Sequence, residues 1–144
     1  MPVANPPAIT DTQVIEWTLT GNVSAGTAQD GLRPMHAPGI ILEIIVTAGQ
    51  KGNTGAALFD VHKHVPAKPV TTQRDNTAGV TVYTTQGNRP DILGDNGTST
   101  QNSIKEAAAP DVTAFLAGDF FTVDVDAANA TMQDVTVSMR VQYN

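Results

Sequence analysis

Hydrophobic and polar residues alternate one by one in three separate segments of this sequence, and no other feature constrains the fold as strongly. The alternating segments are 13–20, 119–126 and 134–143. A period of two is typical of a β-strand with one face against a core and the other in solvent. We therefore expect three strands whose inward side chains are Ile15, Trp17, Leu19, Phe121, Val123, Val125, Val135, Val137, Met139 and Val141.

Three further segments are predicted to be strands. The β-branched run 40–47 lies between Gly39 and Gly49 and is expected to be a central strand covered on both faces, although periodicity alone leaves a short buried helix open. Segment 57–65 places Phe59 and Val61 inward, with Val65 a further candidate for the same face, and a polar set outward. Segment 80–85 alternates in the same way.

Proline and glycine mark the segments between these strands. Residues 1–12 contain three prolines and no periodicity, which predicts an extended arm. We expect 32–39 to be irregular, since its prolines are restricted to an edge strand or a loop, and 63–79 to be a long excursion. A short helical turn over 103–108 is an alternative to loop. Turns or breaks are predicted at 21–26, 49–55, 87–90, 94–97 and 107–111.

Composition supports an all-β fold in a single domain. Of the 144 residues, 40% are hydrophobic, which is enough for one sizeable core, while Thr, Gly, Asn and Pro supply strands and turns. Cysteine is absent, so disulfides and thiolate metal sites are excluded. We predict an antiparallel β-sandwich or jelly roll of about eight strands over 13–144, preceded by the arm 1–12.

Charge and hydropathy exclude two classes of partner. The formal net charge of −6 lacks the basic surface that binding to a phosphate backbone requires, so no nucleic-acid partner is expected. The first ten residues carry no signal-peptide pattern. The longest apolar run, 39–46, contains Glu43 and is too short to cross a bilayer, so no membrane association is expected.

His62 and His64 lie two residues apart on one predicted strand face, and Asp60 precedes them by another two. Two imidazoles and a carboxylate are common zinc ligands, but the same spacing arises whenever outward strand positions are polar. We expect no metal and no other cofactor here. A pH-sensitive contact at a subunit interface is the alternative that remains open.

Acidic residues and serines suggest no catalytic site. Asp119, Asp124 and Asp126 could be read as paired carboxylates, but Asp124 and Asp126 fall on the solvent face of an alternating strand. No serine lies in a Gly-x-Ser-x-Gly turn, and no glycine-rich loop precedes a helix. Aromatic residues make up only 5% and most fall on core positions, so a sugar-binding platform is not favoured. We expect a protein without enzymatic activity.

Four segments carry a resemblance to a known group of proteins. They are LFDVHK (58–63), VYTTQGNRP (82–90), APDVTAFLAGDFFTVDVD (109–126) and VTVSMRVQY (135–143). Together they resemble a β-sandwich module that recurs in tailed-bacteriophage virion proteins, and most of all capsid decoration (cement) proteins. The resemblance covers roughly the last two thirds of the chain. It implies a homotrimer on the outer capsid surface, bound to the major capsid protein of the same phage and stabilising the assembled head.

Two segments are hypothesised to make the capsid contacts. The first is the arm, represented by Pro2, Val3, Pro6, Pro7 and Ile9. The second is an interface loop, represented by His62, His64, Pro66, Pro69 and Arg74. The competing hypothesis is a tail or fibre module that binds a host-surface glycan, which would need clustered exposed aromatic residues. A carboxylate- or metal-dependent glycan hydrolase comes third.

Overall fold

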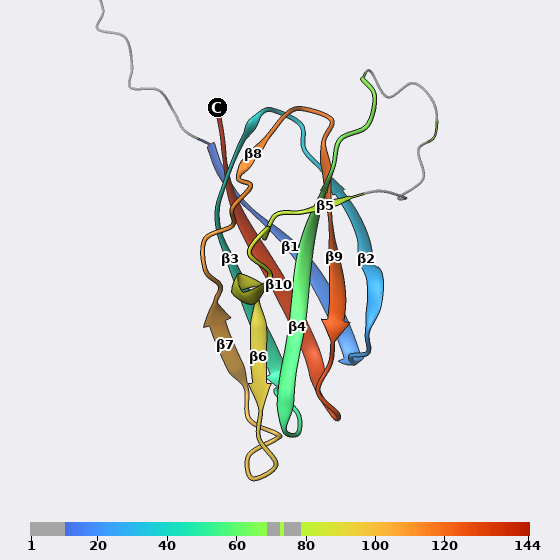
Figure 1. Cartoon of the computed structure of the whole chain (residues 1–144), viewed down its shortest axis with the longest axis vertical. Coiled ribbons are helices and arrows are strands. Elements are labelled where there is room, and N and C mark those ends of the chain that lie inside the picture. Colours follow the sequence, from blue (N-terminus) through green and yellow to red (C-terminus); the bar gives the residue numbers. More distant parts are fainter. Residues whose placement is uncertain (1–10, 69–72, 74–78) are drawn as a thin grey trace, which may run out of the picture.

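The structure is a computed structural model that describes residues 11–68, 73 and 79–144, and in it two antiparallel five-stranded sheets pack face to face (Figure 1). The strands are β1 (Asp11–Asn22), β2 (Gly26–Pro34), β3 (Gly39–Gln50), β4 (Gly55–His64), β5 (Val80–Thr81), β6 (Asp91–Gly94), β7 (Ser103–Glu106), β8 (Ala114–Phe115), β9 (Phe120–Ala127) and β10 (Gln133–Tyr143), with one 3₁₀ turn, η1 (Gln86–Asn88). Across these described ranges, no helix is long and apolar enough to span a membrane.

The strand order is that of a jelly roll. One sheet runs β1-β10-β3-β7, with β8 also paired to β3, and the other runs β2-β9-β4-β5, with β6 also paired to β4. Every pairing is antiparallel, and the first four strands alternate between the two sheets. This order confirms the predicted sandwich or jelly roll. The additional strands beyond eight come from β5 and β8, which are two residues long.

The period of two places the core where the sequence predicts it. Along β10, every second side chain from Val135 to Tyr143 is buried, and the residues between them are only half-buried. Trp17 on β1 is fully buried, and its indole N–H donates to the carbonyl of Gly31, 3.1 Å away. Phe115 packs edge-on against both Phe121 and Tyr143. The two sheets are therefore held by one continuous hydrophobic core.

β2 corrects part of the prediction that 32–39 is irregular, because the strand includes Leu32–Pro34, whereas 35–38 lie outside any strand. Its pairing with β9 shifts register twice, and Ala28 and Asp30 adopt positive φ angles of 47° and 59°. These kinks remove the period of two that would identify a strand. Pro34 ends β2 at the edge of its sheet, which is where a residue without a backbone N–H is tolerated.

Four other expectations are corrected. β3 is central in its sheet, but only one face is buried, since Ile40 is 38% exposed on the other face. The segment 103–108, interpreted as a loop or a short helical turn, contains strand β7 instead. The strand predicted over 80–85 is limited to Val80–Thr81, and Val65, a candidate for the inner face, is 62% exposed.

The strand ends and turns are divided between the two ends of the sandwich. β1 begins at Asp11, so Asp11 and Thr12, assigned to the arm, instead pair with β10, while residues 1–10 lie outside the described residues. The start of β1, the C-terminus, the end of β4 and the start of β5 lie at one end (Figure 1). The β3–β4 turn and the β6–β7 connection lie at the other end. The described residues that flank the two hypothesised contact segments therefore lie at the same end of the sandwich.

Candidate functional site

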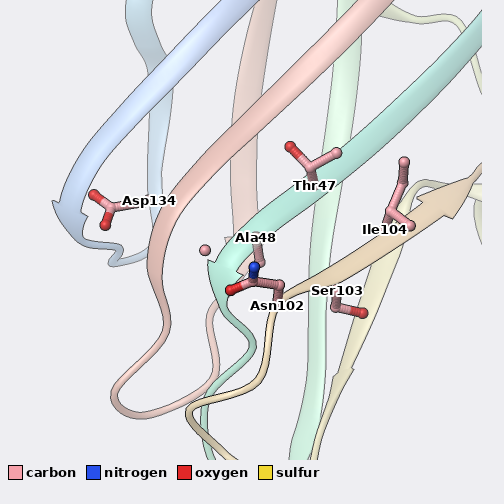
Figure 2. A pocket seen from close by; sticks show the side chains of 7 residues that line it. Thr47, Ala48, Asn102, Ser103, Ile104 and Asp134 are labelled. Carbon is pink, nitrogen blue, oxygen red and sulfur yellow. The ribbon is translucent and has the colours of Figure 1, made fainter.

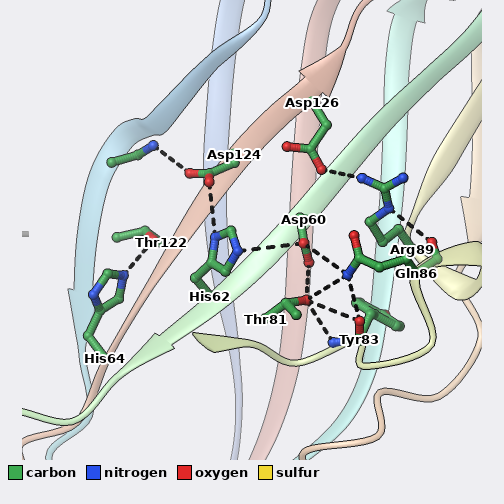
Figure 3. Close-up of polar contacts among 11 residues, drawn as sticks. Asp60, His62, His64, Thr81, Tyr83, Gln86, Arg89, Thr122, Asp124 and Asp126 are labelled. Carbon is green, nitrogen blue, oxygen red and sulfur yellow. Dashed lines mark hydrogen bonds and ion pairs between the residues drawn. The ribbon is translucent and has the colours of Figure 1, made fainter. Parts of the chain in front are cut away.

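Polar side chains gather on the outer face of the sheet formed by β4 and β9 (Figure 3). Asp60 and His62 of β4 face this side, and they are paired in register with Asp124 and Thr122 of β9. Strand pleating places all four on one face, because the side-chain direction alternates along each strand and the two strands are in register. This arrangement confirms the predicted common face of the polar set, but Asp60 is buried, with only 3% of its surface exposed.

His62 lies between two carboxylates. Its Nδ1 is 3.0 Å from Oδ2 of Asp124, and its Nε2 is 3.5 Å from Oδ2 of Asp60. Asp124 also accepts the backbone N–H of Ala28 at 2.7 Å, which ties the kinked strand β2 to the sheet. Asp60 accepts the hydroxyl of Thr81 at 2.6 Å, which ties β5 to the other side. One row of polar groups therefore joins four strands (Figure 3).

His64 forms a second contact beside this row. Its Nε2 lies 2.9 Å from the hydroxyl of Thr122, and its ring stacks on Phe120 with centroids 4.5 Å apart. The residue is only 6% exposed. A Cβ added to Gly79 would lie 2.5 Å from His64 Nε2, so the chain entering β5 passes directly over the imidazole. His64 is part of the packed fold and not a solvent-facing loop residue.

Tyr83 and Gln86 lie next to this row of polar groups, on the side of β5. Gln86 donates to the carbonyl of Tyr83 at 2.7 Å and approaches Asp60 at 3.5 Å. The buried Tyr83 hydroxyl donates to the carbonyl of Ala108 at 3.1 Å. Burial raises the pKa of Tyr83, and the nearby carboxylates of Asp60 and Asp111 raise it further, so this phenol stays protonated at neutral pH.

Most of these partners have no local signal in the sequence. Thr81, Gln86 and the Ala28 amide come from segments with no catalytic or metal-binding pattern, and β5 reaches β4 only after a long excursion. What could have been anticipated is that a buried carboxylate such as Asp60 needs donors from a neighbouring element.

The chemistry available to this face is limited. Thr27, Ala28, His62, His64, Gly79, Thr122 and Asp124 line a hollow of about 280 Å³. Among the residues that the structure describes, no group of three or more His, Cys, Asp or Glu side chains is arranged to hold a metal ion. In the same ranges, no buried side-chain nitrogen or oxygen lacks a hydrogen-bond partner. These polar groups bind one another and stabilise the fold.

The three aspartates considered as paired carboxylates have separate structural partners. Asp119 is 1% exposed, accepts the backbone N–H of Leu116 at 2.8 Å and pairs with Lys68 at 2.5 Å. Asp126 pairs with Arg89 at 2.5 Å. Asp124 faces outward as predicted, but it is bound to β2 and His62 and is not simply solvated.

The structure places only part of the two hypothesised contact segments. Pro66 follows β4 and is half-buried. Pro69 and Arg74 of the interface loop lie outside the described residues, as do the five arm residues Pro2, Val3, Pro6, Pro7 and Ile9. The base of the loop is fixed on both sides, by Lys68 with Asp119 before it and by Thr81 with Asp60 after it.

A second hollow lies on the other sheet, near the end of β3 (Figure 2). It measures about 460 Å³ and is lined by Thr47, Ala48, Gly49, Asn102, Ser103, Ile104 and Asp134. The stick view shows Ile104 directed away from the ribbon, and this side chain is 71% exposed. The lining contains one carboxylate and no histidine, so it offers no acid–base pair.

All seven aromatic side chains of the chain are packed inside the fold. None is more than 9% exposed: Trp17, Phe59, Tyr83, Phe115, Phe120, Phe121 and Tyr143. An aromatic platform for stacking a sugar ring would require at least one of these rings to face solvent. The surface therefore has no such platform.

Fold and surface together define a jelly-roll domain whose polar side chains stabilise the fold. No protein-family model and no curated protein matches the sequence. Among solved structures, the chain is similar to one titled "Capsid of Ralstonia phage GP4", with a TM-score of 0.48 and 16% sequence identity over 99% of this chain and 90% of that chain. A likeness at this level assigns neither a family nor a role.

Proposed function

We propose that this chain is a structural protein of a tailed-bacteriophage virion, a decoration protein that binds the outer surface of the assembled head without catalysing a reaction. The observation that carries the proposal is the jelly-roll strand order, β1-β10-β3-β7 packed on β2-β9-β4-β5, which is an architecture used by viral capsid domains. The same strands carry the segments that resemble phage virion modules. Fold alone does not assign function, so the surface must agree with the role.

The polar side chains support a role without catalysis. Every buried side-chain nitrogen and oxygen in the described ranges has a hydrogen-bond partner, and the clustered His and Asp side chains contact one another. A protein that binds only the assembled shell stabilises that shell by mass action, by about 2.7 kcal/mol per site at a concentration one hundred times the Kd. We propose that a homotrimer bridges neighbouring copies of the major capsid protein in this way.

The alternative of a tail or fibre module that binds a host glycan has less support. Its expected feature is a cluster of exposed aromatic side chains, and all seven aromatic residues are buried. A hydrolase would need a pair of carboxylates open to substrate, whereas Asp124 and Asp126 bind His62 and Arg89.

The test is cosedimentation of the purified protein with undecorated, expanded capsids of its phage, together with its mass in solution by light scattering. Saturable binding of a species of three times 15.1 kDa would support the proposal. Absence of binding at micromolar concentration would contradict it, and the search would turn to tail proteins and host glycans.

A further inference from the structure

Strand β1 forms one edge of its sheet, and part of that edge is bare. The backbone N–H of Thr18 donates to the Asp30 carboxylate at 2.9 Å, and the carbonyl of Glu16 accepts from Arg33 at 3.1 Å. These bonds show that the even-numbered residues of β1 direct their backbone groups away from β10. Pairing with β10 is regular from Asp11 to Leu19, so Thr12 and Val14 point the same way.

β2 covers only one part of this edge. Its residues Asp30 and Arg33 reach Thr18 and Glu16, and the strand then ends at Pro34. Within the described part of the chain, no group bonds to the outward N–H or carbonyl of Thr12 and Val14. This bare stretch, Thr12–Ile15, is called the open edge below.

Among the residues that the structure describes, the open edge lacks the features that usually protect an edge strand. Such strands are blocked by proline, lysine, a bulge or a covering loop. The open edge contains no proline or lysine. The pairing of β1 with β10 shifts register only after Leu19, outside the open edge. Val14 is 56% exposed on it. An exposed strand of this kind is a template for an added strand.

A hollow beside the open edge provides room for a side chain of the added strand. It measures about 320 Å³ and is lined by Gln13, Val14, Ile15, Glu16, Arg33, Pro34, His36 and Tyr143. In strand addition, main-chain hydrogen bonds supply affinity and pockets for alternate side chains supply specificity. The open edge offers both unpaired main-chain groups and a hollow for a side chain.

Charge indicates which strand would fit. Asp11 and Glu16 flank the open edge, and neither forms an ion pair among the residues described. The cations on either side of it already have partners, since Arg33 pairs with Asp30 at 2.8 Å and Arg140, opposite Val14 on β10, pairs with Glu43 at 2.8 Å. The edge therefore carries uncompensated negative charge on both sides of Val14, which favours an extended segment with lysine or arginine.

We propose that the open edge accepts an extended, basic segment of the shell protein as an added β-strand. This inference rests on the proposed function and names the surface through which the head is bound. The shell contact would then consist of main-chain hydrogen bonds to Thr12 and Val14, one side chain in the hollow, and ion pairs with Asp11 and Glu16.

The test uses Val14→Pro in the full chain. The Val14 N–H points away from β10, so proline removes only the outward donor and leaves the β1–β10 pairing intact. Capsid affinity measured by cosedimentation is expected to fall at least tenfold. Glu16→Gln is expected to reduce the dependence of binding on salt concentration. Urea unfolding of each variant verifies that the sandwich stays folded.

Val14→Lys and Ile104→Lys form a matched pair, because both replace an exposed aliphatic residue of the same sheet, at its opposite edges. Val14→Lys is expected to weaken binding to the capsid, and Ile104→Lys to leave it within twofold. Equal binding of Val14→Pro and the unchanged protein would overturn the inference. So would a fall in oligomeric mass for Val14→Pro, since the edge would then join copies of this chain. If the unchanged protein fails to bind, the proposed function itself is wrong.

Discussion

Asp60 and Asp124 occupy directly paired positions of β4 and β9, on the same face, and the imidazole of His62 contacts both carboxylates. Like charges opposite one another on paired strands are destabilising unless another group separates them. In this fold the separating group is His62, assisted by the Ala28 amide and the Thr81 hydroxyl. The polar side chains on this face of the sheet therefore attach β2 to β9 and β5 to β4.

His62→Ala is expected to lower the free energy of unfolding by about 1–3 kcal/mol, because it leaves two carboxylates facing each other without a donor between them. Adding Asp124→Asn should recover part of that loss, so the two effects should be less than additive. Urea unfolding at pH 7 measures both. Arg140→Ala, which breaks the more exposed pair with Glu43, is the control and should cost less than about 1 kcal/mol. Additive losses would show that His62 acts independently of Asp124.

The sequence predicts strands well where one face of the strand is buried and the other is not. β10 shows this most clearly, because its two faces differ in burial at nearly every residue from Val135 to Tyr143. β7 was missed because Ser103–Glu106 has no fully buried residue and so has no hydrophobic period. β2 was missed because the positive φ of Ala28 and Asp30 interrupts the alternation.

The candidate site was predicted only in its local part. Alternation placed Asp60, His62 and His64 on one face, which is a property of β4 alone. Their burial depends on Thr81 and the chain at Gly79, which return to β4 after the long excursion. Contacts of this range leave no local pattern, because they depend on where the loop closes. The open edge likewise depends on where β2 ends in space.

Gly94→Ala is expected to destabilise the fold by about 1–3 kcal/mol. A Cβ on Gly94 would lie 1.6 Å from the carbonyl oxygen of Asn53 and 2.9 Å from that of Gly52, so the backbone of the β3–β4 turn must move. Gly87→Ala is the matched control, because nothing lies within 4 Å of its added Cβ. Its free energy of unfolding should change by less than about 0.5 kcal/mol. Thermal unfolding compares the two variants. Equal melting temperatures would contradict the close packing of Gly94 against the backbone of Asn53.

Asp111 should make stability depend on pH in the acid range. The backbone N–H of Thr85 donates to its carboxylate at 2.8 Å, and this hydrogen bond lowers the pKa of Asp111 below its ordinary value of 3.8. A lowered pKa in the folded state contributes stability above pH 3.8, and that contribution is lost as the pH falls through the lower folded value.

The measurement for Asp111 is urea unfolding of the unchanged protein and of Asp111→Asn between pH 7 and pH 2. The unchanged protein should be the more stable of the two at pH 7, and the difference should shrink below pH 3.8 as its carboxylate is protonated. A difference that stays constant over this range would show that the charge of Asp111 has no part in holding Thr85.

Deletion of residues 1–10 tests the docking role predicted for the arm. The described core is built from residues after Asp11, so the shortened chain should keep its free energy of unfolding within about 0.5 kcal/mol. Its capsid affinity should fall, because an extended segment adds main-chain hydrogen bonds and apolar contacts to a partner. Cosedimentation with expanded capsids measures this, and combination with Val14→Pro separates the arm from the open edge. If the two contacts are independent, their losses multiply in Kd, whereas unchanged occupancy after deletion would refute the role of the arm.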